Sequence, residues 1–401
     1  MREMVTRKTI YLDNASTSAV RMEVLDSMIP YFIEEFGNPD SIHAMGKSGR
    51  DAVKRARESL AKMINADPDE IYMTSGGSES NSWAIRSAVT GPRAKGRHVI
   101  VSSIEHHSVI NACEYIRKLG VDVTYLSVDP SGLVDPAEVE RAIRPDTAII
   151  SVMTANNEIG TIEPIKEIGE VARRHGVLFH TDAVQAYGQV DIDVRRDNID
   201  LLSASSHKLG GPKGVGLLYI RKGVRLDPLI HGGEQERGIR GGTTNVPGVV
   251  GFGKAAELAL ADMEERAEKE RTLRDHLIGR VLNEIPYSRL NGDRERRLPS
   301  NANFSFDHIE GESILMSMNM AGICISTGSA CASGSLDPSH VLLALGLPHE
   351  TAHGSLRFSI PSDTTMEDID HAVDVLRDTV ERLRSLSPLY DDFLRSQKGE
   401  A

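Results

Sequence analysis

A lysine stands between a candidate strand and a glycine-rich turn. Lys208 follows the apolar stretch 201–205 in the run Ser-Ser-His-Lys, and the turn 210–212 (Gly-Gly-Pro) comes soon after it. A lysine in this position can point into a crevice, where a partly buried, polar site promotes loss of its proton and allows Schiff-base chemistry. Because most lysines are exposed, a solvated surface side chain is the alternative for Lys208 taken alone.

Another candidate strand ends at a residue with a carboxylate side chain. Asp182 ends the apolar stretch 177–182, and a carboxylate at the buried end of a strand needs a cationic or hydrogen-bonding partner. The protonated ring nitrogen of pyridoxal would be such a partner, and this pairing makes that cofactor an electron sink. Capping of the following helix is an equally good interpretation of Asp182.

A turn rich in glycine and serine separates a candidate strand from a candidate helix. Residues 74–81 have the sequence Thr-Ser-Gly-Gly-Ser-Glu-Ser-Asn. Backbone N–H groups and hydroxyls at a helix N-terminus bind anions such as phosphate. The turn has neither the lysine of a Walker motif nor the spacing of the dinucleotide fingerprint, and an ordinary helix cap is the alternative.

The sequence contains only three cysteines, and one of them has the surroundings of a reactive thiol. Cys331 lies in the segment 326–335, which is rich in Gly, Ser and Ala. Reactive cysteines occupy accessible, polar settings, although an inert loop cysteine is the alternative here. Cys324 fits a buried strand and Cys113 a helix, so we expect both to be inert. An odd, sparse set of cysteines indicates a reducing compartment, by default the cytoplasm.

These features lie at strand ends and in loops of an alternating pattern. Candidate strands occur at 71–75, 98–102, 123–128, 148–154, 177–182, 201–205 and 216–220, and helical stretches such as 136–143 and 165–174 lie between several of them. The alternation predicts an α/β fold with a mostly parallel, seven-stranded sheet that is covered on both faces. Ligands of such sheets bind beyond the carboxyl ends of the strands.

A long helical pattern at about 250–284 leads into a second, smaller α+β domain. Its candidate elements are 301–306, 312–320, 339–345, 355–359 and 366–384, and the tail after Leu386 is expected to fray. We expect a large cofactor-binding domain of residues 16–255. Residues 1–15 and 256–401 would form the small domain, which carries the cysteine loop.

Composition excludes several classes of partner. The chain has 401 residues and a net charge of −12 without a basic stripe, which argues against binding to nucleic acid. No run approaches the roughly 20 apolar residues of a membrane span, and residues 1–9 contain no apolar stretch of signal-peptide length. We therefore expect neither nucleic acid nor a membrane as a partner, and we assign no metal site.

Several longer motifs carry a family resemblance. They are Tyr-Leu-Asp-Asn-Ala at 11–15, Phe-Gly-Asn-Pro at 36–39, the turn 75–81, Asn-Asn-Glu-Ile-Gly at 156–160, Asp-Ala-Val-Gln at 182–185, Ser-His-Lys at 206–208, Gln-Glu-Arg-Gly at 235–238 and Gly-Ser-Ala-Cys at 328–331. The chain resembles the cysteine desulfurases (NifS/IscS-like), a family with the class V aminotransferase fold, from residue 11 to about residue 372. The resemblance implies the fold of pyridoxal-phosphate-dependent transferases.

The resemblance also implies a cofactor and catalytic residues. The cofactor would be pyridoxal 5′-phosphate, bound covalently to Lys208, which would later move protons. His106 would stack on the pyridine ring, and Cys331 would take the sulfur. Asp182 would contact the ring nitrogen and Gln185 the ring hydroxyl, and Asn157 would be a further cofactor contact. The phosphate would be bound by Gly77, Ser78, Ser205 and His207. Thr243 would reach the phosphate from the other subunit of a homodimer.

The implied substrate is L-cysteine. Arg357 would bind its carboxylate with the planar guanidinium fork, and Asn157 would share that task. The products would be L-alanine and a persulfide on Cys331, whose sulfur passes to an iron–sulfur cluster scaffold or another sulfur-relay protein. Two alternatives are a selenocysteine lyase of the same fold, which has less need of a travelling thiol, and a non-catalytic docking partner of a sulfur-transfer protein.

Overall fold

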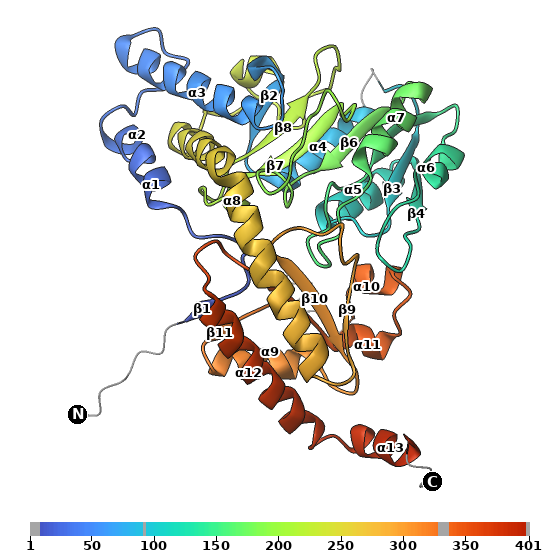
Figure 1. Cartoon of the computed structure of the whole chain (residues 1–401). Helices are drawn as coiled ribbons and strands as arrows, with labels where there is room; N and C mark the ends of the chain where they lie inside the picture. Colours follow the sequence, from blue (N-terminus) through green and yellow to red (C-terminus); the bar gives the residue numbers. More distant parts are fainter. Residues whose placement is uncertain (1–8, 91–93, 328–336, 398–401) are drawn as a thin grey trace, which may run out of the picture.

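The computed structural model describes residues 9–90, 94–327 and 337–397 of the chain. Its larger part has helices packed on a central sheet, and its smaller part combines short strands and helices (Figure 1). The long helix α8 (Val246–Glu284) runs through both parts. Among the described helices, none is both long enough and apolar enough to cross a membrane.

A seven-stranded sheet forms the middle layer of the larger part. Its order is β2 (Ile71–Thr74), β8 (Gly216–Ile220), β7 (Leu201–Ser205), β6 (Leu178–Asp182), β5 (Thr147–Ser151), β3 (His98–Ser102) and β4 (Asp122–Leu126). Strand β8 is antiparallel to both of its neighbours, and the remaining pairs are parallel. The predicted mostly parallel sheet is therefore confirmed, and every predicted strand is present with ends that differ by a few residues at most.

Helices cover both faces of this sheet. On one face α4 (Gly77–Thr90) and α5 (His107–Arg117) pack against side chains such as Val99, Ile149 and Leu218. On the other face α3 (Ala44–Lys62), α7 (Ile165–His175) and the first half of α8 pack against Ile100, Phe179 and their neighbours. Because β3, β5, β7 and β8 are buried at every position, their sequences are mostly apolar and contain no Asp, Glu, Lys or Arg. Shorter elements are α1 (Met22–Met28), α2 (Pro30–Ile33) and α6 (Pro136–Ala142).

The smaller part is built on an antiparallel sheet. Strand β10 (Asn301–Phe306) lies between β12 (Ser355–Ser359) and β9 (Ser288–Leu290). Strand β1 (Ile10–Tyr11) pairs in parallel with β11 (Ile323–Cys324), so the N-terminal segment joins this part of the molecule. The surrounding helices are α9 (Gly311–Met320), α10 (His340–Ala344), α11 (His349–His353), α12 (Met366–Arg384) and α13 (Pro388–Gln397).

Helix α8 contributes to two separate apolar cores. Its residues from Val246 to Ala259 pack in the core of the larger part, and those from Leu273 to Val281 pack in the core of the smaller part. The helix begins earlier than the sequence pattern predicts, because the Asn245 side chain accepts a hydrogen bond from Gly248 N (3.1 Å) and caps it. The domain boundary at residues 255/256 stays a prediction.

The expectation of a frayed tail after Leu386 is wrong. Residues Pro388–Gln397 form helix α13. Phe393 on this helix stacks on His308 with ring centroids 4.3 Å apart, and it also contacts Tyr287 edge-on at 5.1 Å. Aromatic contacts with residues about a hundred positions earlier therefore hold the tail, and such contacts leave no local signal in the sequence.

Candidate active site

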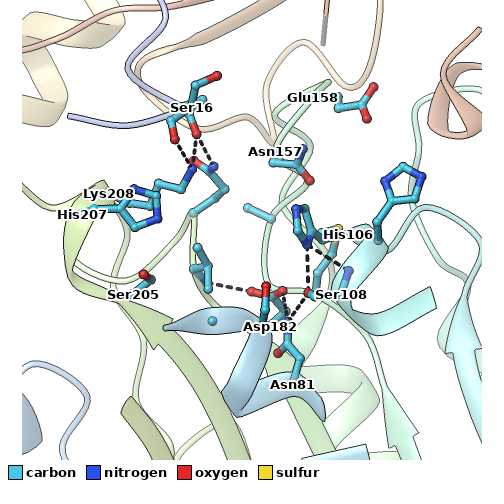
Figure 2. Close-up of a pocket in the computed structure, with 18 of the residues that line it drawn as sticks. Ser16, Asn81, His106, Ser108, Asn157, Glu158, Asp182, Ser205, His207 and Lys208 are labelled. Atoms are coloured by element: carbon cyan, nitrogen blue, oxygen red, sulfur yellow. Dashed lines mark hydrogen bonds between the residues drawn. The ribbon is translucent and has the colours of Figure 1, made fainter. Parts of the chain in front are cut away.

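A cavity of about 300 Å³ opens beyond the sheet, between the larger and the smaller part of the molecule. It brings together ten of the residues that the resemblance implicates, some of which are labelled in Figure 2. They come from helix starts, strand ends and loops: Gly77, Ser78, His106, Asn157, Asp182, Gln185, Ser205, His207, Lys208 and Arg357. The crevice expected from the sheet topology is therefore present.

Lys208 lies in the short 3₁₀ helix Ser206–Lys208, directly after β7, and it lines the cavity. Its Nζ donates hydrogen bonds to the carbonyl oxygens of Ala15 (2.5 Å) and Ser16 (2.8 Å), as Figure 2 shows. Gln185 Nε2 donates to the same Ala15 oxygen (2.9 Å). The alternative of a solvated surface lysine is therefore wrong, because the ammonium group is held inside the cavity.

Asp182 ends β6 and is only 4% exposed. Its Oδ2 accepts a hydrogen bond from Asn81 Nδ2 (2.6 Å), and its Oδ1 accepts one from Val184 N (2.9 Å). Asn81 also donates to Ser108 Oγ (2.8 Å), which lies 2.8 Å from His106 Nδ1. A chain of polar contacts through Asn81 and Ser108 therefore joins the Asp182 carboxylate to the His106 imidazole.

The turn before α4 has the geometry of an anion site. Gly76 has φ +154°, and a Cβ on Gly77 would lie 2.6 Å from Val184 Cγ2, so both positions favour glycine. The N-terminus of the 14-residue helix α4 and the side chains of Ser78 and Ser205 face the cavity. Burial, with the neighbouring Lys208 and Lys213 charges, lowers the pKa of His207 to about 4. His207 is therefore a neutral hydrogen-bonding group at neutral pH.

This set of groups fits pyridoxal phosphate. Across the described part of the chain no lysine or arginine forms an ion pair with Asp182, so a protonated ring nitrogen would supply the missing cation. The α4 turn offers N–H groups and hydroxyls for a phosphate, and Lys208 offers the amine. In the same cavity, Asn81 Oδ1 is buried without a hydrogen-bond partner among the described residues.

Arg357 lies in the middle of β12 and is 2% exposed. Its Nη1 donates to the carbonyl oxygen of Asn157 (3.0 Å), while its Nη2 contacts Asp13 Oδ1 (2.9 Å) and Ser16 Oγ (2.8 Å). These contacts therefore hold the Arg357 guanidinium in one orientation at the cavity wall. Asn157 meets Arg357 through its backbone oxygen, and its side chain is labelled at the cavity in Figure 2.

One implicated residue, Thr243, does not line this cavity. Thr243 lines a separate cavity of about 180 Å³, together with Ser75, Arg240 and other residues of its own chain. Cys331 lies outside the described residues. The described chain nevertheless runs up to Thr327, whose carbonyl oxygen accepts from Ser355 Oγ (3.4 Å), and Ser326 pairs with Arg357 through backbone hydrogen bonds.

The cavity also contains residues to which the sequence analysis gave no role. His340, at the start of α10, lies with its ring 4.7 Å from that of His107, and its Nε2 donates to the Glu105 carbonyl oxygen (2.9 Å). Burial raises the pKa of the Glu105 carboxyl well above its usual value, which favours the neutral acid. Others are Ser16, Asn81, Ser108 and Glu158. Asn81 was present in the quoted turn, whereas only the tertiary structure brings His340 here.

Comparisons with known proteins agree with this geometry. The Aminotransferase class-V family model matches residues 10–372. Cysteine desulfurase IscS of Methanosarcina thermophila is 54% identical over 382 residues, which covers 95% of this chain and 94% of that protein. Cysteine desulfurase IscS of Clostridium botulinum (strain Hall) is 52% identical over 393 residues, with 98% and 99% covered.

Solved structures of related proteins also resemble this chain. A NifS-like protein superimposes with a TM-score of 0.88 at 35% identity, covering 94% of this chain and all of that one. SspA in complex with cysteine gives a TM-score of 0.79 at 40% identity, with 89% and 100% covered. The chain belongs to the class V aminotransferases, pyridoxal-phosphate-dependent enzymes, and within them to the cysteine desulfurase family.

Proposed function

We propose that this enzyme removes sulfur from L-cysteine and holds it on Cys331. The observation that carries the proposal is the cavity that unites Lys208, Asp182, His106 and Arg357. A lysine for covalent cofactor binding, a carboxylate for the ring nitrogen and an arginine for an amino acid's carboxylate are the groups that amino-acid chemistry on pyridoxal phosphate requires. A non-catalytic docking partner has no need of this set, so the cavity argues against that alternative.

Each residue has a separate task in the proposed reaction. When bound, pyridoxal phosphate supplies an aldehyde for the substrate amine and a ring that stabilises negative charge at the α-carbon. Arg357 orients the substrate by its carboxylate, and Lys208 accepts and returns protons. Cys331 Sγ forms a bond to the substrate sulfur as the sulfur–Cβ bond breaks. The electron pair of that bond stays with carbon, which then takes up a proton, so L-alanine and a persulfide result.

The position of Cys331 in the chain supports its role. Cys331 comes four positions after Thr327, which is hydrogen-bonded to the strand that carries Arg357. Four extended residues span at most about 14 Å. The spacing in the sequence therefore allows the Cys331 thiol to reach a substrate that Arg357 holds.

The activity itself gives the direct test. The purified protein, loaded with pyridoxal phosphate, is expected to convert L-cysteine to equimolar L-alanine and sulfide when a thiol reductant is present. Chromatographic quantification of alanine and colorimetric quantification of sulfide check this. Alanine without sulfide, or pyruvate in place of alanine, would contradict the proposed reaction, and faster turnover of selenocysteine at equal concentration would favour the lyase alternative.

We also propose that the enzyme is a homodimer whose partner completes the cofactor site. Thr243 does not line the main cavity of its own chain, although its hydroxyl suits a phosphate. An exposed apolar stretch supports self-association, since large exposed apolar surfaces mark interaction sites. It comprises Met22, Phe32, Ile33, Phe36 and Ile42, each more than half exposed.

Thr243→Ala is expected to speed loss of pyridoxal phosphate about fivefold or more, because one phosphate hydrogen bond disappears. Dialysis followed by absorbance measurement checks this, and the melting temperature of the cofactor-free protein should stay the same. Thr244→Ala, at the neighbouring position, is the matched control with little expected effect. A fully active, cofactor-loaded monomer in analytical ultracentrifugation would exclude the dimeric site.

The receiver of the sulfur and the location of the enzyme belong to the same proposal. An iron–sulfur cluster scaffold or a sulfur-relay protein is the proposed acceptor, supported by the desulfurase names of the relatives. A reducing compartment, the cytoplasm, is the proposed location, supported by the sparse cysteines of the sequence.

A further inference from the structure

A carboxylate of the protein already contacts the arginine that is proposed to bind the substrate. Asp13 Oδ1 lies 2.9 Å from Arg357 Nη2, and the two side chains are 19% and 3% exposed. Ser16 Oγ lies 2.8 Å from the same nitrogen and 2.8 Å from Asp13 Oδ1. The three groups form a closed cluster that is largely shielded from water and salt.

The contacts of Nη2 restrict how another carboxylate can approach. A guanidinium offers paired hydrogens along two edges, Nη1–Nη2 and Nε–Nη2, and a two-pronged carboxylate uses one of these edges. Both edges include an Nη2 hydrogen. Because Asp13 and Ser16 contact Nη2, a substrate carboxylate that forms two hydrogen bonds must share Nη2 with them or displace one of them.

Asp13 is held in place and has little freedom to withdraw. Tyr11 Oη donates to the Asp13 carbonyl oxygen (3.0 Å) or to that of Thr17 (2.7 Å), both within the same turn. Ala15 N donates to Ser359 Oγ (2.8 Å) on β12, two residues beyond Arg357. The turn is therefore attached to the strand that carries the arginine, and a bound substrate would have its carboxylate close to that of Asp13.

We infer that Asp13 is an internal counter-ion of Arg357 that competes with the substrate carboxylate and so weakens binding of the amino acid. The inference rests on the proposed substrate-binding role of Arg357. Asp13 stabilises the ligand-free enzyme more than the complex, in which the two carboxylates share one guanidinium and repel each other. Removing its charge therefore favours the complex.

The test measures equilibrium binding and not turnover. L-Alanine, the expected product, carries the carboxylate and the amine but no sulfur, and its binding to the cofactor-loaded enzyme is followed by the absorbance change of the cofactor. Asp13→Asn keeps the shape and one acceptor oxygen, removes the charge, and replaces the other oxygen by an NH₂ group. It is expected to lower the dissociation constant of L-alanine roughly fivefold and to lower the melting temperature of the alanine-free enzyme by about 2 °C.

Two further variants separate this effect from a general change of charge. Glu158→Gln removes a charge from the same cavity, but Glu158 Oε2 accepts from Ser339 Oγ (2.5 Å) and not from Arg357. It should change alanine binding less than twofold. Ser16→Ala removes the other contact of Nη2 without changing the charge and should tighten binding by a smaller factor than Asp13→Asn. Asp13→Ser, which also removes the charge, decides the question if Asp13→Asn does not fold.

In the same assay, Arg357→Ala tests the substrate-binding role of Arg357 separately from the competition by Asp13. It is expected to weaken L-alanine binding tenfold or more, and an unchanged constant would reject the substrate-binding role of Arg357 itself. If Arg357→Ala weakens binding while Asp13→Asn leaves it unchanged or weakens it as well, only the competition is refuted. An equal gain in Asp13→Asn and Glu158→Gln would also overturn it, because bulk charge would then explain the effect.

Discussion

Replacing Cys331 by serine is expected to abolish release of L-alanine from L-cysteine, to below about 1% of the normal rate. A serine hydroxyl is a poor nucleophile toward sulfur and is almost entirely protonated at neutral pH, whereas a free thiol with a pKa of ~8.5 is a few per cent thiolate. Cofactor content should be normal, since the cavity groups that fit pyridoxal phosphate come from other segments of the chain. Parallel assays of alanine and of bound cofactor measure both effects.

The other two cysteines provide matched controls. Cys113 is buried in α5, and burial raises the pKa of its thiol to about 12, so it carries no thiolate at neutral pH. Cys324 lies in β11, paired with β1. Cys113→Ser and Cys324→Ser should therefore retain turnover, although a buried hydroxyl at position 113 lowers stability. Mass spectrometry after brief exposure to L-cysteine should find the extra sulfur on the Cys331 peptide; sulfur on Cys113 or Cys324 would refute the mechanism.

The sheet could be predicted from the sequence because its strands are buried on both faces. Strands such as β3, β7 and β8 are short, mostly apolar stretches, and their predicted ranges coincide with the structure. The site residues near strand ends followed from the same pattern, since Asp182 is the last residue of β6 and Lys208 ends the short 3₁₀ helix that follows β7. Local pattern and global topology agree here, which is why the crevice could be anticipated.

The rest of the site depends on contacts that no local pattern encodes. Asp13 meets Arg357 across almost the whole length of the chain, and the motif that contains Asp13 gave no hint of an ion pair. Asn81 links Asp182 to Ser108 by hydrogen bonds between two helix N-termini and a strand end. Such contacts depend on side-chain directions and on the packing of distant elements, and a single sequence reveals neither.

The position of the N-terminal segment has a functional consequence. The sequence predicts that residues 1–15 belong to the small domain, and it indicates no catalytic or binding role for any of them. In the structure the carbonyl oxygens of Ala15 and Ser16 accept from Lys208 Nζ, while Asp13 and the Ser16 hydroxyl contact Arg357. A single turn therefore touches both the lysine and the arginine, and a change in this turn is expected to affect the two together.

Replacing Lys208 by alanine is expected to remove the covalent attachment of the cofactor completely and to lower turnover at least ~100-fold, the usual contribution of a positioned proton-transfer group. Lys208 is the lysine that lines the cavity, with its Nζ 2.5 Å and 2.8 Å from two backbone oxygens. An alanine leaves no amine to bond the aldehyde and no group to move protons. Some cofactor should still bind non-covalently, because the phosphate and ring contacts remain.

Borohydride reduction followed by peptide mass spectrometry measures the attachment directly, since the reduced bond survives digestion. In the unaltered enzyme the cofactor mass is expected on the peptide that contains Lys208. Lys213, five residues later and exposed, is the matched control: Lys213→Ala should keep both the covalent cofactor and the turnover. If Lys208→Ala retained the label and Lys213→Ala lost it, the covalent role would belong to Lys213, and the geometry of the cavity would have to be reconsidered.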